Sequence, residues 1–299
     1  MKLTQVQGFH IELTNKCTLK CPACARTKFL DKWPQHWKNH SIDPNDLFNF
    51  LDIDLQGKII TLSGNYGDPI YHNNFLDIVK TLKSHGANVY VNTNGSYKCP
   101  KFWQDLCDLL TEQDRITFAI DGIPENFTQY RINADWTSIK IALDFVSKSV
   151  VQKVWQYIIF SYNQDTVEQA KQISKSFGFD FKIVHSDRYD ETTYWLQPDE
   201  SYINEKNSSK LLFKQGQPVD KINPLCSDGC QHYISADGYY SPCCMVAEHS
   251  FYYKTLFGKQ KRSFAINETS FSSVLDLQTT QEFYSSLPNQ PVCQFNCPS

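Results

Sequence analysis

Cysteine is the residue type whose number and spacing point most directly to chemistry in this sequence. The chain of 299 residues contains 11 cysteines, and three of them form the segment Cys17-x3-Cys21-x2-Cys24. Three thiolates in so short a loop can bind one corner of an iron–sulfur cubane, since cysteine is the usual ligand of such clusters. One iron of the cubane would then stay open to a substrate or a cofactor. A structural zinc loop completed by one histidine is the alternative interpretation. The candidate histidines are His10, His36 and His40.

Six further cysteines lie in the last quarter of the chain. They are Cys226, Cys230, Cys243, Cys244, Cys293 and Cys297. The N-terminal sequence lacks an apolar run and a cleavage site of small residues, so we expect no secretory signal and a cytoplasmic protein. In a reducing compartment cysteines seldom form disulfides and more often bind metals or clusters. The sequence therefore predicts two thiolate-rich sites joined by a cysteine-poor body, in which Cys99 and Cys107 are structural.

The overall composition is that of a folded protein without a strong net charge. Hydrophobic residues make up 41% of the chain and charged residues 20%, which argues against disorder. The net charge of -3 gives no long-range attraction to nucleic acid or to anionic membranes, so we expect neither as a partner. No run of about 18 apolar residues is present, so we expect no transmembrane helix. Aromatic residues reach 14%, which indicates a well-filled interior or an aromatic-lined pocket.

The first 185 residues alternate between strand and helix patterns. Six β-rich runs are bounded by polar residues or glycine, and they cover residues 8–13, 58–62, 88–92, 115–120, 153–160 and 180–184. Amphipathic helical patterns lie between them, as in the spacing of Phe75, Ile78, Val79 and Leu82. Strands that alternate with helices predict parallel βαβ units. This pattern alone leaves open whether the sheet is flat or curled into a barrel.

Short motifs follow the predicted strands. They are Gly67-Asp68-Pro69 after the second strand, Asn92-Thr93-Asn94-Gly95 after the third, Asp121-Gly122 at the end of the fourth, and Arg131 ten residues after Asp121. Together with the first cysteine segment, these motifs resemble those of the radical S-adenosylmethionine superfamily over residues 8–185. Two positions depart from the pattern: Tyr66 stands where the family has a glycine, and Ala119 stands where relatives have a serine.

The resemblance implies a fold and a cofactor. The family folds as a partial (β/α)6 barrel, so we expect an α/β fold with a small C-terminal iron–sulfur domain made of a β-hairpin and a helix. Cys17, Cys21 and Cys24 would bind a [4Fe–4S] cluster whose open iron is chelated by S-adenosylmethionine. In this family the reduced cluster cleaves S-adenosylmethionine, and a 5′-deoxyadenosyl radical then abstracts hydrogen from a substrate.

The resemblance also implies which residues bind the cofactor. They are Gly67, Asp68, Pro69, Asn94, Asp121 and Arg131. The turn at 67–69 would offer backbone carbonyls and an acid to the ammonium group of S-adenosylmethionine. Arg131 would offer its guanidinium to the carboxylate. Asn94 and Asp121 follow strands at their C-terminal ends, which form the mouth of such a barrel.

The C-terminal cysteines bracket Asp237-Gly238, which predicts the turn of a β-hairpin. This arrangement resembles the twitch or SPASM extension of the same superfamily, and it implies one auxiliary [4Fe–4S] cluster with four cysteine ligands. We rank the candidates in the order Cys226, Cys243, Cys297, Cys293, then Cys230 and Cys244. Neighbouring residues in an extended strand point to opposite sides, so we expect only one of Cys243 and Cys244 to be a ligand. A zinc cluster is the alternative.

Catalytic candidates come from the first strand and from the mouth of the barrel. On the first strand His10 and Glu12 alternate with an apolar face, so we expect both to point into the cavity and to contact substrate or move protons, as we also expect for Asp121. The alternative is that His10 and Glu12 only bond each other. His185 and the loop at 187–190, which follow the last strand, are further candidates for substrate contacts.

We expect three parts in the chain: the barrel at 1–186, a linker at 187–222 and the auxiliary-cluster domain at 223–299. The first strand begins near residue 8, so no separate peptide-binding domain is expected before it. The substrate is then a small polar molecule or a short peptide, and the electron donor is a protein such as flavodoxin or ferredoxin. A two-cluster electron carrier or redox sensor without S-adenosylmethionine chemistry is the alternative function.

Overall fold

The computed structural model describes residues 3–186, 189–202, 222–224, 226, 229 and 232–297. Six parallel strands come first: β1 (Gly8–Ile11), β2 (Ile59–Leu62), β3 (Asn88–Thr93), β4 (Arg115–Ala119), β5 (Gln152–Ile158) and β6 (Asp180–Val184). The predicted strands are confirmed, with ends that differ by at most two residues. No helix in these described ranges is long and apolar enough to cross a membrane.

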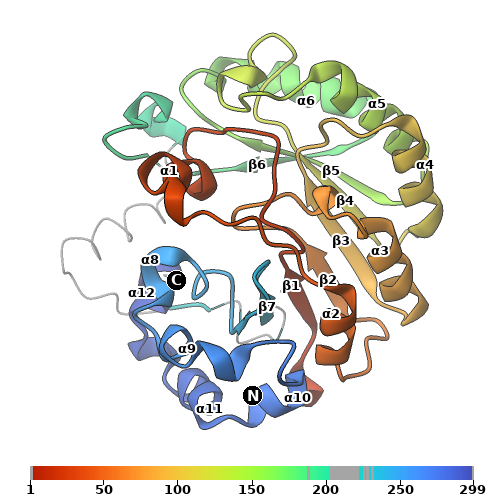
Figure 1. Cartoon of the computed structure of the whole chain (residues 1–299). Coiled ribbons are helices and arrows are strands. Elements are labelled where there is room, and N and C mark those ends of the chain that lie inside the picture. The colour runs from red at the N-terminus through yellow and green to blue at the C-terminus, as the bar shows by residue number, and fades with distance from the viewer. Residues whose placement is uncertain are drawn as a thin grey trace.

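Helices connect the strands and cover one side of the sheet. They are α1 (Ala25–Lys32), α2 (Pro44–Phe50), α3 (Phe75–Ser84), α4 (Pro100–Leu109), α5 (Trp136–Ser147) and α6 (Val167–Ser176). Figure 1 shows α3, α4, α5 and α6 side by side along the outer side of the curved sheet, while α1 lies on the open side. The α/β fold with a partial barrel is therefore confirmed.

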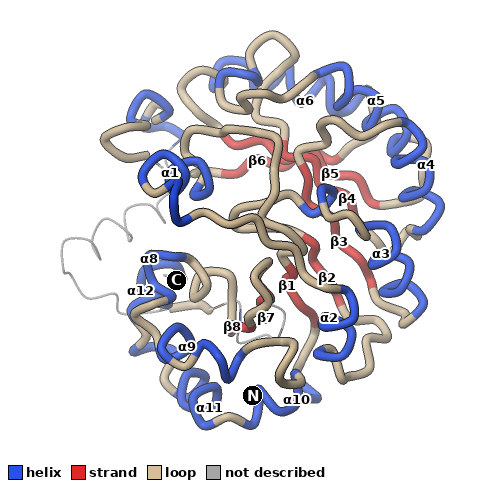
Figure 2. The backbone as a smooth tube through the Cα atoms, in the orientation of Figure 1, coloured by secondary structure: helices blue, strands red, loops and turns tan. Residues whose placement is uncertain are grey.

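The C-terminal region continues the same sheet. Its elements are β7 (His232–Ile234), β8 (Tyr240–Ser241), α8 (His249–Tyr252), α9 (Leu256–Lys259), α10 (Phe271–Asp276), α11 (Gln278–Ser285) and α12 (Pro291–Asn296). Strands β7 and β8 are antiparallel, as the predicted hairpin requires, but β7 also pairs with β1 in parallel. The strand order is therefore β6-β5-β4-β3-β2-β1-β7-β8, and the hairpin extends the barrel sheet. In Figure 2 the strands form one curved layer, with α3, α4, α5 and α6 along its outer side and α1 on its open side.

The two faces of β1 separate core from cavity. Phe9, Ile11 and Leu13 are fully buried in the main hydrophobic core. Glu12 lines a cavity on the other face, as the alternation predicted, whereas His10 is not among the residues that line this cavity. Burial of three large apolar side chains contributes about 1.5–3 kcal/mol each, which fixes the register of β1 and hence the direction of His10 and Glu12.

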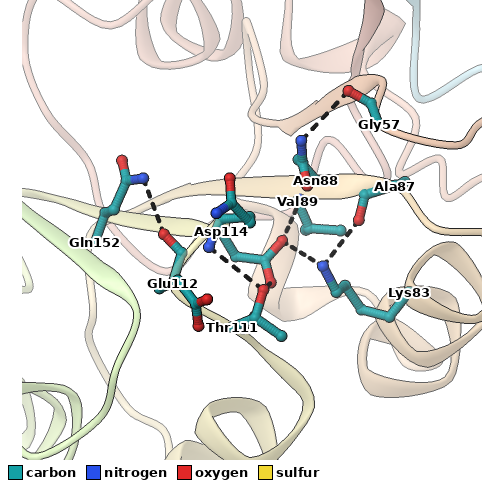
Figure 3. Close-up of polar contacts among 10 residues, drawn as sticks. Gly57, Lys83, Ala87, Asn88, Val89, Thr111, Glu112, Asp114 and Gln152 are labelled. Atoms are coloured by element: carbon teal, nitrogen blue, oxygen red, sulfur yellow. Dashed lines mark hydrogen bonds and ion pairs between the residues drawn. The ribbon is translucent and has the colours of Figure 1, made fainter.

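A buried carboxylate lies at the amino-terminal ends of β3 and β4, which is the end of the sheet opposite the strand-end motifs. Figure 3 shows Asp114 among its partners. Its Oδ1 accepts from the main-chain nitrogen of Val89 at 2.6 Å and from Lys83 Nζ at 2.7 Å, and its Oδ2 accepts from both Thr111 donors. Asp114 is fully buried, so these bonds replace the water that its charge lost. These contacts join α3 and the amino-terminal ends of β3 and β4.

Candidate functional site

The first cysteine loop lies between β1 and α1 at the carboxyl ends of the strands. Cys21 is buried, and Cys17 and Cys24 are half-buried. The three side chains lie in one cluster with Leu19 and other apolar residues. Arg26 holds the loop in shape, because its Nη2 donates to the carbonyl of Cys17 at 2.7 Å and to that of Leu19 at 2.5 Å. The structure therefore brings the three predicted ligands together.

Two nitrogen donors point at the sulfur atoms. Asn94 Nδ2 lies 3.6 Å from Cys17 Sγ, and Arg131 Nη1 lies 3.8 Å from Cys21 Sγ. Burial raises the pKa of Cys17 to about 12 and that of Cys21 to about 11, so each thiolate needs added positive charge in order to form. The Nε of Arg131 is buried and has no hydrogen-bond partner among the described residues. Donors that stabilise thiolates, together with this unpaired Nε, fit an iron–sulfur cluster.

No group of three or more His, Cys, Asp or Glu side chains in the described part of the chain is arranged to hold a single metal ion. This applies to both cysteine groups as far as they are described.

The Gly67-Asp68-Pro69 turn packs directly against the cysteine loop. A Cβ atom on Gly67 would lie 1.9 Å from the carbonyl oxygen of Thr14, so only glycine allows this close approach. Pro69 begins a short 3-10 helix (Pro69–Tyr71) that Asp68 caps. The motif that the resemblance assigns to the cofactor therefore touches the loop assigned to the cluster.

Asp68 links the motifs of β2 and β3. Its Oδ2 accepts from the main-chain nitrogen of Asn94 at 2.7 Å, from Asn94 Nδ2 at 2.6 Å and from Thr93 Oγ1 at 3.0 Å. The carboxylate is only 4% exposed, and burial raises the pKa of Asp68 to about 6 although these bonds oppose the shift. Asp68 thus fixes the position of Asn94 beside Cys17.

Asp121 holds Arg131 in place. Its Oδ2 lies 2.6 Å from Arg131 Nη2, and both side chains are buried or nearly so. Its Oδ1 accepts from the main-chain nitrogen of Ile158 at 2.8 Å, and its carbonyl accepts from Asn163 Nδ2 at 3.1 Å. Asp121 therefore joins the ends of β4 and β5 and directs one nitrogen of Arg131 toward Cys21.

His10 and Glu12 do not bond each other, because each has a partner elsewhere. Glu12 accepts from the main-chain nitrogens of Tyr66 at 2.7 Å and Gly67 at 2.9 Å, and from Tyr233 Oη at 2.6 Å. Burial raises the pKa of Glu12. His10 Nε2 lies 3.1 Å from the carbonyl oxygen of Ser63, and burial lowers the pKa of His10 to about 4.

A cavity of about 290 Å³ opens between the segment that follows β1, the segment after α1 and the C-terminal hairpin. Aromatic side chains form much of its wall, together with Glu12. They include Phe29, Trp37, Tyr66, Tyr233, Tyr239 and Tyr252. The composition indicated an aromatic-lined pocket but not these residues, since the wall joins segments about 200 positions apart. Tyr66 was visible only as a departure from the family pattern.

Four C-terminal cysteines lie near one another. Cys226 and Cys293 are buried, and Cys243 and Cys297 are half-buried. The main-chain nitrogen of Cys297 donates to the carbonyl of Cys293 at 2.8 Å. Burial, and then the charges of Cys226, Cys243 and Cys297, raises the pKa of Cys293. These are the four that the sequence ranked first. Cys244 lies elsewhere: its carbonyl accepts from Asn65 Nδ2 at 2.9 Å, and it influences the pKa of Tyr233. Cys230 is outside the described residues.

The loop after β6 reaches the cysteine loop. Asp190 forms an ion pair with Lys28 of α1. His185 Nδ1 lies 2.6 Å from the carbonyl oxygen of Tyr202, and none of the three candidates at 185, 189 and 190 lines the cavity. Asp187 and Arg188 are outside the described residues.

Comparison with known families gives a match to the radical SAM superfamily over residues 11–172, which is more than half of the chain. The chain belongs to this superfamily. Its cysteine loop and strand-end motifs lie within or close beside the matched region. Radical SAM proteins are enzymes that use S-adenosylmethionine and a [4Fe–4S] cluster, so this protein is an enzyme of that class.

Two curated proteins are similar in sequence. A candidate glycyl-radical enzyme activating enzyme of Methanocaldococcus jannaschii is 26% identical over 206 residues, which is 65% of this chain and 76% of that protein. The tungsten-containing aldehyde ferredoxin oxidoreductase cofactor-modifying protein of Pyrococcus furiosus is 28% identical over 120 residues. That match spans 38% of this chain and only 31% of the Pyrococcus protein.

Solved structures share the fold. Native anSMEcpe with bound AdoMet aligns with a TM-score of 0.61 at 13% identity, over 97% of this chain and 89% of that one. SuiB of Streptococcus suis bound to S-adenosylmethionine aligns with a TM-score of 0.61 at 9% identity, over 97% and 77%. BtrN in complex with AdoMet and 2-DOIA aligns with a TM-score of 0.52 at 14% identity, over 98% and 93%.

Proposed function

We propose that this enzyme holds a radical-generating [4Fe–4S] cluster on Cys17, Cys21 and Cys24 and abstracts hydrogen from a substrate bound in the aromatic cavity. When bound and reduced on these three cysteines, such a cluster would supply the electron for cleavage of S-adenosylmethionine into methionine and a 5′-deoxyadenosyl radical. The protein's own residues bind, orient and shield the reacting groups.

One observation carries the proposal. Asn94 donates to the carboxylate of Asp68 and also points at the sulfur of Cys17. The turn assigned to the cofactor and the loop assigned to the cluster therefore meet at one side chain. Chelation of a cluster iron by S-adenosylmethionine requires such contact between the two sites.

Glu12 connects this centre to the cavity. It binds the amides of Tyr66 and Gly67 and also lines the cavity wall. The Glu12 carboxylate accepts from these two amides and from Tyr233, and it thereby holds the turn and Tyr233 in position. We therefore assign Glu12 a positioning role. Asp121 has the same role for Arg131, because its oxygens are bonded within the protein. His10, which faces the open side of the sheet next to Tyr233, is our candidate for proton transfer.

The C-terminal region, residues 223–299, would hold an auxiliary [4Fe–4S] cluster. Two observations support this: Cys297 bonds the main chain of Cys293, and the charges of Cys226, Cys243 and Cys297 act on the pKa of Cys293. Such a cluster would accept an electron from the substrate radical, bind the substrate or relay electrons. The position of Cys244 beside Tyr233 favours Cys243 as the ligand of that pair.

The cavity supports a small polar molecule or one residue of a short peptide as substrate. Its volume of about 290 Å³ is near the lower end of ligand pockets. Relatives illustrate both classes: BtrN was solved with 2-DOIA, and anSMEcpe was solved with peptides. The match to a candidate activating enzyme adds a protein substrate to the possibilities for testing.

Anaerobic reconstitution with iron and sulfide tests the proposal. We expect about eight irons per chain, and about four after Cys17, Cys21 and Cys24 are all replaced by alanine. With dithionite and S-adenosylmethionine, the wild type should form 5′-deoxyadenosine slowly without substrate, and the triple variant should form none. An electron carrier would bind iron without cleaving S-adenosylmethionine, and a zinc protein would do neither. An iron count that the triple replacement leaves unchanged refutes the assignment.

A second pair of replacements tests the auxiliary site. Changing Cys226 and Cys297 to alanine should remove about four irons and leave 5′-deoxyadenosine formation intact. Substrate turnover should then stop. Normal turnover by the folded variant would show that the second site is only structural.

A further inference from the structure

We propose that the substrate carries a carboxylate on a planar, apolar body, and that Lys261 in the wall of the aromatic cavity binds this carboxylate. The inference rests on the proposed function, because it takes the cavity as the substrate site, and it adds the chemical class of the substrate. The position of Lys261, the hydrogen-bonding groups of the wall and its aromatic rings together support it.

Lys261 places an ammonium group at the cavity wall. Its Nζ lies 2.9 Å from Asp237 Oδ2 and 3.9 Å from the centre of the Tyr239 ring, and all three residues line the cavity. An ammonium group has three N–H donors. Asp237 is the one hydrogen-bond acceptor of Lys261 among the residues that the structure describes. Two donors of Lys261 therefore remain for a ligand.

The carboxylates of the wall already have donors. Glu12 accepts from two main-chain amides and from Tyr233 Oη. Asp237 accepts from Lys261 and from Ser235 Oγ at 2.5 Å. A ligand that brings further donors would compete with these bonds, whereas a ligand that brings acceptors would not.

Other groups of the wall add donors without acceptors. Lys38 lines the cavity, is exposed and forms no ion pair in the part of the chain that the structure describes. Tyr252 also lines the cavity, and its buried Oη has no hydrogen-bond partner among the described residues. Burial raises the pKa of Tyr252, so this hydroxyl keeps its proton. The histidine rings of the wall can donate or accept and favour neither class of ligand. A carboxylate, which only accepts, is the complement of the remaining donors.

Aromatic rings define the body of the ligand. The rings of Trp37 and Tyr66 pack at 69° with their centres 5.9 Å apart. Tyr66 Oη accepts from the main-chain nitrogen of His249 at 3.3 Å, which joins the turn after β2 to α8 across the cavity wall. Rings held in this way favour contact with planar or apolar groups. The cavity volume of about 290 Å³ limits that body to about the size of one aromatic side chain.

Four small probes test the charge and the ring that the cavity selects. Binding is measured by saturation-transfer NMR on the reconstituted protein with saturating S-adenosylmethionine. Hydrocinnamate should bind, and hydrocinnamamide and phenylpropylamine, which lack the carboxylate, should bind about tenfold or more weakly. Propionate, which lacks the ring, should also bind about tenfold or more weakly. Equal binding of the acid, the amide and the amine, or no binding of the acid, overturns the proposal. Displacement of hydrocinnamate by S-adenosylmethionine also overturns it, since the cavity would then belong to the cofactor.

Variants test the role of Lys261. Lys261→Met should weaken hydrocinnamate binding by about tenfold or more and leave hydrocinnamamide binding unchanged. Lys261→Met/Asp237→Asn removes both charges of the ion pair and should show the same loss, which separates the missing ammonium from an unpaired Asp237. The matched control is Lys259→Met, because Lys259 is exposed at the end of α9 and does not line the cavity. The control should bind hydrocinnamate like the wild type. Wild-type affinity in Lys261→Met overturns the proposal.

A free acid and the C-terminus of a peptide are two sources of the same carboxylate. Tighter binding of the tripeptide alanyl-alanyl-phenylalanine than of hydrocinnamate, lost in the tripeptide amide, assigns the peptide, and the reverse order assigns the free acid. Dithionite separates this inference from the proposed function. If the wild type forms 5′-deoxyadenosine with dithionite but does not bind hydrocinnamate, only this inference fails. If it forms none, the proposed function fails.

Discussion

Replacing Glu12 with glutamine changes the hydrogen bonds that join the turn at Tyr66 and Gly67 to Tyr233 in the cavity wall. The side chain keeps its size and shape. The glutamine oxygen can still accept from the amides of Tyr66 and Gly67, which lie 2.7 and 2.9 Å from the carboxylate. Its amide nitrogen would face Tyr233 Oη, which now donates to the carboxylate at 2.6 Å. In Glu12→Gln, the two bonds from the amides of Tyr66 and Gly67 therefore have a neutral acceptor. The bond from Tyr233 loses its acceptor.

The magnitude follows from the difference between charged and neutral hydrogen bonds. A bond to a charged group contributes about 1.5–3 kcal/mol, and a neutral bond about 0.5–1.5 kcal/mol, so each of the two amide bonds weakens by about 1 kcal/mol. The local opening of the turn at Tyr66 and Gly67 should then become easier by about 2 kcal/mol, or about 30-fold in its equilibrium constant. The same substitution should raise the global free energy of unfolding. Burial, which raises the pKa of Glu12, makes its charge costly in the folded state, and glutamine has no charge to desolvate.

Amide hydrogen exchange measured by mass spectrometry reports this local opening. Exchange in the peptide that contains Tyr66 and Gly67 should accelerate by about 30-fold in Glu12→Gln, while peptides of α4 should change little. Tyr239→Phe is the matched control, since Tyr239 lines the same cavity and its hydroxyl has no hydrogen-bond partner among the residues that the structure describes. That variant should leave exchange at Tyr66 and Gly67 unchanged.

Two outcomes would refute the reasoning. Unchanged exchange in Glu12→Gln would mean that the carboxylate does not hold the turn. Equal acceleration in every peptide would mean that the substitution acts on global unfolding and not on these bonds.

Three further predictions concern the scaffold and the site. Asp114→Ala should lower the free energy of unfolding by about 3–5 kcal/mol, because it leaves Lys83 and the buried amide of Val89 without their partner. Denaturant titration measures this change. The folded fraction of the variant should remain active. Burial lowers the folded pKa of His10 to about 4, so the unfolded state binds more protons between pH 6.5 and 4, and stability should fall with falling pH by up to about 1.4 kcal/mol per unit. Thermal melts across this range should be flatter for His10→Asn than for the wild type. Gly67→Ala places a Cβ atom against the carbonyl of Thr14, so calorimetry should show at least about tenfold weaker S-adenosylmethionine binding, and wild-type affinity would contradict the close approach.

Strand positions were predictable because alternation and helix period are local signals. Phe9, Ile11 and Leu13 identify the buried face of β1 by their spacing alone, and the same spacing places His10 and Glu12 on the other face. No such local pattern predicts the pairing of β7 with β1. It joins segments more than 200 residues apart, and each strand is compatible with several neighbours.

The roles of the strand-end acids show where sequence reasoning stops. The resemblance placed Asp68 in the turn after the second strand, and Asp121 was expected at the C-terminal end of the fourth strand, and the structure has both residues at these positions. Their oxygens, however, bond Asn94, Arg131 and nearby main-chain amides. Whether a carboxylate faces a ligand or the protein depends on packing between strands, which a motif does not encode.

The bond between Glu12 and Tyr233 joins the first part of the chain to the C-terminal hairpin. Glu12 directly follows β1 and accepts from the amides of Tyr66 and Gly67, whereas Tyr233 lies on β7 of the C-terminal hairpin. Main-chain pairing of β1 with β7 aligns them, and both line the cavity. A shift of β7 by one residue would turn Tyr233 away from the cavity and leave Glu12 without one of its donors. Cys243 follows this hairpin and Cys17 follows β1, so the pairing of β7 with β1 fixes how the two strands lie from which the cysteine segments continue.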